Sequence, residues 1–160
     1  MLWAADSRDG LDPICLPADI EEISMSKIEN IRPKSVHPEF GGLYVHARKV
    51  TNPESLLYIS GQVGVDKDGN FGKDCKEQLQ IAWGNVDAIL SEAGMSKSNI
   101  VEVFVFINGA PRHDVEANKA LYAESVVEYF GENVPVMSAL VSAGLWVDDL
   151  CFEFKLVAAK

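Results

Sequence analysis

The stretch DDLCFEFKLVA, residues 148–158, has the pattern of the last strand of a folded domain, and it carries a carboxylate among apolar residues. Side chains of a β-strand point alternately to its two faces, which predicts one wholly apolar face. That face carries Leu150, Phe152, Phe154 and Leu156. The opposite face carries Cys151, Glu153, Lys155 and Val157. A Glu beside a Lys is typical of the polar face of a half-covered sheet, so a functional role for Glu153 needs support from the rest of the chain.

Four other stretches have strand-like composition. Residues 43–50 and 56–65 are joined by the turn TNPES, which predicts a hairpin. The run IVEVFVFI, residues 100–107, lacks clean alternation, which predicts a central strand covered on both faces. Residues 135–144 precede the final strand, 150–159. The chain therefore contains at least five predicted strands.

Two helical periods lie between these strands. One runs from Asp74 to Gly94 and the other from Asp114 to Gly131, each with an aspartate as the expected cap and a glycine as the expected stop. The element order is then ββαβαββ. This order predicts an α+β fold with a mixed sheet and with both helices on one face.

The second face of the sheet needs a cover, because two helices cannot cover both faces of a sheet of this size. We expect that face to carry apolar residues such as Val103 or Val105 together with polar ones. Self-association into a closed homo-oligomer is the common way to bury such a face. We therefore expect a functional site at the interface between copies of the chain.

The composition predicts one globular domain, preceded by an acidic extension. The chain has 160 residues, of which 48% are hydrophobic and 24% are charged. Residues 1–24 hold six acidic residues against one arginine and show no sustained hydrophobic period, so we expect a flexible extension, with a docked tail as the alternative. Met25 opens a stretch that resembles a protein start, which predicts a single domain over residues 25–160.

Charge and cysteine content narrow the possible partners. A net charge of −10, with no cluster of Lys and Arg among aromatic residues, disfavours binding to nucleic acid. No stretch is long and apolar enough to suggest a membrane span or a targeting segment. Cys15, Cys75 and Cys151 show no spacing suited to zinc or to a disulfide framework, so we expect a cytoplasmic protein in a reducing environment.

The order of these segments resembles the RidA/YjgF family. The matching pieces are GLYVHARKV at Gly42–Val50, LLYISGQVG at Leu56–Gly64, EANKALYAESVVEYF with Asn118 and Tyr122, and the terminal FEFKLVAA. The resemblance covers about residues 30–159. It implies a chorismate-mutase-like fold, a homotrimer, and a small-molecule site in each cleft between subunits.

The resemblance also implies a chemistry and a set of site residues. Deaminating members of the family hydrolyse enamines and imines such as 2-aminoacrylate without a metal or cofactor. By position, Glu153 resembles the residue that activates water and Tyr44 the site tyrosine. Ser60 and Gly61 match the lining strand, and Asn118 matches the polar residue of the second helix.

This chain departs from the family pattern at the residue that would bind a substrate carboxylate. Deaminating relatives have Pro-x-Arg-Ser where this chain has PVMS, so Met137 replaces the arginine before Ser138. A thioether cannot pair with a carboxylate. Arg48, His46 and Lys155 are the cations that we consider as substitutes, although a sheet-edge or surface role is the commoner one for such residues.

Three functions follow as hypotheses. The first is an enzyme that acts on an enamine, an imine or a related metabolite that is larger or less anionic than 2-aminoacrylate. The second is a catalytically silent trimer that binds a metabolite in a regulatory role. The third, an endoribonuclease as some relatives are called, is disfavoured because the acidic chain would repel RNA.

Overall fold

The computed structural model describes residues 26–160, and the acidic extension predicted for residues 1–24 lies outside this range. The elements follow one another in the order β1 (Lys27–Ile31), β2 (Ala47–Thr51), β3 (Leu56–Val63), α1 (Cys75–Glu92), η1 (Lys97–Asn99), β4 (Ile100–Asn108), α2 (Val115–Phe130), β5 (Val136–Ser142) and β6 (Phe152–Ala159). The predicted order is confirmed from β2 onward, and β1 is an additional short strand.

Both helices begin and end where their capping residues predict. The side chain of Asp74 accepts a hydrogen bond from the Glu77 amide at 2.8 Å, and Gly94 follows α1 with a φ of 66°. The side chain of Asp114 accepts one from the Ala117 amide at 3.0 Å at the start of α2. These local signals explain why the two helices could be located from sequence.

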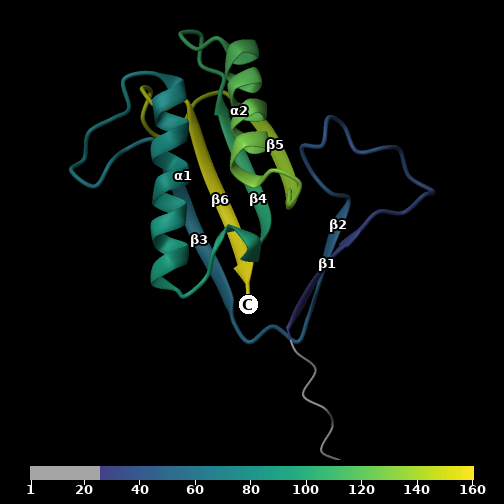
Figure 1. The fold of residues 1–160 in the computed structure, drawn as a ribbon. Coiled ribbons are helices and arrows are strands. Elements are labelled where there is room, and N and C mark those ends of the chain that lie inside the picture. Colours follow the sequence, from purple (N-terminus) through teal and green to yellow (C-terminus); the bar gives the residue numbers. More distant parts are fainter. Residues whose placement is uncertain (1–25) are drawn as a thin grey trace, which may run out of the picture.

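The main sheet has four strands in the order β3-β6-β4-β5. β6 is antiparallel to both β3 and β4, and β4 is parallel to β5, as a helical crossover through α2 allows. Figure 1 shows α1 and α2 on the same face of this sheet. The α+β class, the mixed sheet and the central position of β4 are thereby confirmed.

The helix-covered face of the sheet holds the core, and it includes two residues that we had placed on the other face. Val103 and Val105 are both fully buried, and Val105 lies opposite Phe154 in the register of β4 and β6. Alternation then turns Phe104 and Phe106 to the opposite face, which we call the open face. The prediction for the two valines was wrong because β-branched and aromatic residues alternate along β4, so either set could have faced the core.

The predicted hairpin of residues 43–50 and 56–65 is also wrong. β2 pairs with β1, whereas β3 pairs with β6. Arg48 holds the β1–β2 ribbon in place, because its guanidinium donates hydrogen bonds to the carbonyl oxygens of Ile100, Asn133 (3.0 Å) and Val134 (3.1 Å). Figure 1 shows the ribbon on the β5 side of the molecule, away from β3.

A disulfide joins two cysteines whose spacing in sequence predicted none. Cys75 and Cys151 are 76 residues apart in the chain, and their Cα atoms are 5.5 Å apart in the fold. Cys151 is buried, so its sulfur does not share the open face with Glu153 as alternation predicted. The absence of a disulfide was one premise for a cytoplasmic location, which stays a prediction.

Within residues 26–160, no helix combines the length and apolarity that crossing a membrane requires.

Candidate functional site

Glu153 lies on the open face, where its side chain crosses the neighbouring strand at a glycine. It sits in β6 between Val63 of β3 and Phe106 of β4. The register of β3 shifts between Ile59 and Gln62, so Gly61 lies in a bulge. A Cβ atom on Gly61 would overlap the carboxylate oxygen of Glu153 and would lie 2.8 Å from its Cδ. Glycine at this position therefore makes room for the Glu153 carboxylate.

Two other residues singled out from the sequence lie on the same open face as this carboxylate. Lys155 follows Glu153 by two residues on the same face, and it lines a cavity of about 280 Å³ with Phe104 and Phe106. Ser138 lies opposite Phe104 in β5 and is exposed on this face. We call Gly61, Glu153 and Lys155 the Glu153 half-site.

Ser60 precedes Gly61 in the same bulge. Its side chain is exposed, and its backbone carbonyl accepts a hydrogen bond from Gln62 Nε2 at 3.1 Å. A predicted lining role for Ser60 therefore rests on its position beside Gly61.

Tyr44 and Met137 meet in a second cavity, of about 330 Å³, beside β5 and α2. The hydroxyl of Tyr122 donates a hydrogen bond to Met137 Sδ at 3.4 Å, and burial raises the pKa of Tyr122. Lys119 also lines this cavity. We call Tyr44, Lys119, Tyr122 and Met137 the Met137 half-site.

The two half-sites lie on opposite faces of the sheet. Met137 is opposite Val103, which points into the core beneath the helices. Glu153 is opposite Phe106, which points to the open face. Since directly opposed residues of neighbouring strands share a face, one chain cannot bring Met137 and Glu153 together around one small ligand.

Asn118 does not line either cavity. It is 3% exposed, and its Nδ2 has no hydrogen-bond partner within residues 26–160. Lys119, the next residue, lines the Met137 half-site instead. Sequence reasoning missed Lys119, although its spacing of three residues from Tyr122 places both on one helix face.

Two of the three cations considered as substitutes for the missing arginine are engaged elsewhere. Arg48 is bound to backbone carbonyls, and burial lowers the pKa of its guanidinium. His46 Nε2 lies 2.8 Å from the carbonyl oxygen of His37. Lys155 stays on the open face with Glu153. Lys119 lines the same cavity as Met137, where it also pairs with Glu116.

Another cavity, of about 400 Å³, lies between the two helices. Trp83 and Tyr129 are stacked there with ring centroids 4.4 Å apart, and the Tyr129 hydroxyl donates a hydrogen bond to Asp87. Burial and this bond raise the pKa of Tyr129. None of the predicted site residues lines this cavity, so its size alone does not make it the site.

Comparison with known proteins identifies relatives across most of the chain. The model of the family described as endoribonuclease L-PSP matches residues 35–160. A RutC family protein of Pyrococcus abyssi is 33% identical over 121 residues, which are 74% of this chain and 87% of that protein. The RutC family protein YjgH of Escherichia coli K12 is 39% identical over 103 residues, which are 64% of this chain and 74% of that protein.

Solved structures of similar fold cover the same region. The Rid family protein YyfB of Yersinia pestis, of unknown function, has a TM-score of 0.72 over 83% of this chain and 98% of its own, and at 23% identity this likeness concerns the fold. TdcF of Escherichia coli, solved with bound serine, is 26% identical, with a TM-score of 0.59 over 81% of this chain and 93% of its own.

Proposed function

The chain belongs to the RidA/YjgF family, and from this premise we propose that it is an enzyme that hydrolyses or tautomerises an enamine, an imine or a related small metabolite. The observation that carries the proposal is the Glu153 carboxylate, which crosses Gly61 on the open face. The proposed roles are Glu153 as general acid and base and Tyr44 as an orienting hydroxyl.

The chemistry requires little more than a positioned carboxylate. An enamine takes up a proton at carbon to become an imine, and water then attacks the imine carbon and displaces the amine. A half-exposed carboxylate can accept the proton of that water and return it to the leaving nitrogen. Glu153 fits this role because the room above Gly61 sets the direction of its side chain.

We propose that the complete site forms between subunits of a homotrimer. Met137 and Glu153 lie on opposite faces of one sheet, so a ligand can contact both half-sites only if they come from two chains. The open face also carries apolar side chains, among them Phe104, Phe106 and Leu140, that a neighbouring subunit would cover.

The presence of Met137 favours a substrate that is larger or less anionic than 2-aminoacrylate. A paired charge in a partly desolvated site contributes on the order of 2 to 5 kcal/mol to recognition, and Met137 cannot supply it. TdcF was solved with serine, which carries a carboxylate. Lys119 is a cation that lines the same cavity as Met137, but it also pairs with Glu116 at 2.7 Å.

The test measures loss of 2-aminoacrylate generated in situ by a dehydratase. We expect slow turnover by the wild type and faster turnover by Met137→Arg, because arginine restores a bidentate partner for the carboxylate. Met137→Leu is the matched control, since it fills the same space without charge. Adding Glu153→Gln to Met137→Arg should abolish the gain, because an amide cannot accept the proton, a loss of roughly 10² to 10⁴. Glu102→Gln removes another carboxylate of the open face and should leave turnover unchanged.

Two results would contradict this proposal. Efficient wild-type turnover that falls in Lys119→Met would mean that Lys119 has replaced the arginine and that the substrate is as anionic as 2-aminoacrylate. No gain from Met137→Arg in a folded trimer, with tight metabolite binding that Glu153→Gln leaves intact, would favour the catalytically silent regulatory trimer. The bond between Tyr122 and Met137 is the observation that keeps this second candidate open.

A further inference from the structure

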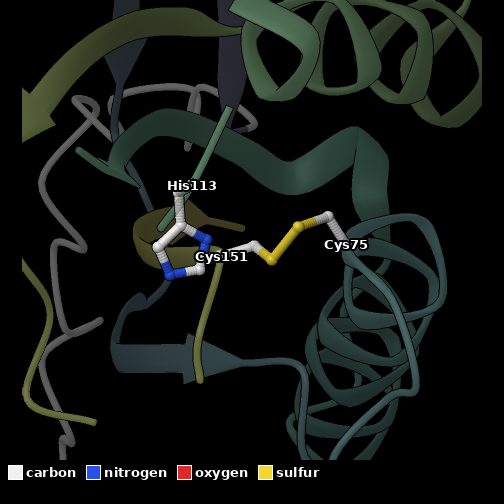
Figure 2. A group of neighbouring side chains, drawn as sticks. All are labelled: Cys75, His113 and Cys151. Atoms are coloured by element: carbon white, nitrogen blue, oxygen red, sulfur yellow. A yellow bond between two sulfur atoms is a disulfide. The ribbon is translucent and has the colours of Figure 1, made fainter. Parts of the chain in front are cut away.

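Three side chains that can bind a metal converge outside both half-sites. Cys75 is the first residue of α1, His113 precedes α2, and Cys151 directly precedes β6. One potential ligand atom from each of the three lies within 4.8 Å of the others. Figure 2 shows the imidazole ring of His113 beside the disulfide, with one ring nitrogen turned toward the sulfur atoms.

The hydrogen bonding of His113 leaves Nδ1 free to bind a metal. His113 Nε2 lies 2.9 Å from the carbonyl oxygen of Asp148, and since a carbonyl only accepts, Nε2 carries the hydrogen. The contact of Arg112 Nε with the same nitrogen is longer, at 3.4 Å, and the Arg112 guanidinium also pairs with Asp149. Nδ1 then keeps its lone pair, which is the arrangement that metal-binding histidines have when a carbonyl orients the ring.

The backbone around Cys151 is held by bonds other than the disulfide. Gln78 accepts a hydrogen bond from the Cys151 amide at 2.8 Å and donates one to the carbonyl of Asp149 at 2.9 Å. Asn108 Nδ2 donates to the carbonyl of Leu150 at 2.7 Å. Gln78 and Asn108 are 4% and 0% exposed, so the two side chains that make these bonds are shielded from water. The frame that positions the Cys151 sulfur is therefore expected to persist when the disulfide is broken.

We propose that Cys75, Cys151 and His113 bind one Zn²⁺ ion once the disulfide is reduced. A dithiol supplies two electrons and two protons, the S–S bond breaks, each cysteine becomes a thiol, and the dithiol becomes its own disulfide. Zn²⁺ then displaces both thiol protons to solvent and forms two bonds to sulfur and one to His113 Nδ1. The fourth position of the tetrahedral ion is left for water or a small ligand.

Geometry and charge favour zinc among the common metals. Zn–S bonds of about 2.3 Å in a tetrahedral site place two sulfur atoms about 3.8 Å apart, which a short side-chain movement allows after reduction. Two thiolates and an imidazole are ligands that zinc prefers. Cys75 also sits at the N-terminus of α1, where the helix dipole stabilises a thiolate.

Metal binding and oxidation exclude each other at this site. A sulfur atom that is bonded to the other cysteine has no thiolate to offer, and a zinc-bound thiolate is protected from forming the disulfide. Cys75 is half-buried whereas Cys151 is buried, so an attacking dithiol is expected to reach the Cys75 sulfur first. The cluster thus takes either a disulfide or a metal ion, according to the thiol redox state.

The experiment compares the oxidised and the reduced full-length chain. The reduced protein is prepared with dithiothreitol, which gel filtration then removes under anaerobic conditions. Zn²⁺ is titrated against a chromophoric chelator, and Co²⁺ serves as a spectroscopic probe of thiolate ligation. We expect one zinc ion per reduced chain, Co²⁺-to-thiolate absorption bands, and no such site in the oxidised chain. Zinc should also slow re-formation of the disulfide.

Single substitutions assign the ligands. Cys75→Ser should remove the site, whereas Cys15→Ser should leave it unchanged. His113→Ala should weaken zinc binding by at least about tenfold, and His46→Ala is its matched control. Equal zinc binding by the oxidised chain or by Cys75→Ser would overturn the proposal. So would a reduced wild type that binds no zinc or that loses its fold by circular dichroism, since the bonds of Gln78 and Asn108 would then not hold the frame.

Discussion

The two faces of the four-stranded sheet differ in what covers them, although both are formed by alternate residues of the same strands. In β6, Phe154 and Leu156 are at most 1% exposed beneath the helices, whereas Lys155 is exposed and Glu153 is half-exposed on the open face. The helix-covered face thus forms a core within one chain. The open face combines apolar rings with charges, and in our proposal it is completed only by another copy of the chain.

The same comparison separates the residues of the proposed chemistry. Successive residues of a strand point to opposite faces, so Met137 of β5 lies beneath the helices whereas Glu153 of β6 lies on the open face. Both half-sites are preformed within the chain, by the bond between Tyr122 and Met137 and by the glycine beneath Glu153. What one chain lacks is their juxtaposition.

The largest expected effect comes from placing a charge on the open face. Phe104→Asp should convert the proposed trimer into monomers, because a carboxylate there would be buried without a partner at the interface. Val127→Asp is the matched control, since Val127 is 55% exposed on α2 and should leave the mass unchanged. Light scattering at micromolar concentration measures both. A wild type that is monomeric, or a Phe104→Asp protein that stays trimeric, would contradict the proposed interface.

Substitutions at two neighbouring residues of β6 test how much each face contributes to the free energy of unfolding. Leu156→Ala should lower the free energy of unfolding by about 2 to 5 kcal/mol, because it empties space beneath the helices. Val157→Ala, measured in the monomeric Phe104→Asp protein, should lower it by less than about 1 kcal/mol. Denaturant unfolding gives both values. Equal losses would mean that the open face is packed within the chain after all.

A smaller effect is expected from adding a single methyl group at Gly61, beneath the Glu153 carboxylate. Gly61→Ala should reduce turnover by roughly a hundredfold in the Met137→Arg protein, because the new Cβ displaces the Glu153 carboxylate. Gly84→Ala is the control, since a Cβ there meets no atom within 4 Å and should stabilise α1 by up to about 1 kcal/mol. Unchanged turnover in a folded Gly61→Ala protein would show that the position of Glu153 does not limit the reaction.

Several features were predictable because their causes are local. The caps at Asp74 and Asp114 and the stop at Gly94 act within one helical turn, so the helices could be bounded from sequence. The final strand and the side of Glu153 follow from alternation over a few residues. The family followed from the order of these segments, which comparison with known proteins confirmed.

Other features needed the fold because they depend on distant residues. Whether residue 118 or 119 reaches a cavity depends on a turn of about 100° per residue around α2, and family position alone indicated Asn118 rather than Lys119. The roles proposed for Glu153, Tyr44, Ser60, Gly61, Asn118, Met137 and Ser138 stay predictions until the variants are measured.

Capping, periodicity and alternation are interactions between near neighbours, so the elements from β2 onward, their order and the residue types available for chemistry could be derived from the sequence. The fold was needed to establish the partner of β2, the face of Val103 and Val105, and the joining of Cys75 to Cys151. Each of these depends on which strands and helices pack together, and the spacing of residues along the chain carries no direct record of that packing. The separation of Met137 from Glu153 has the same origin, since both lie in strands whose faces are assigned only when the helices cover one side.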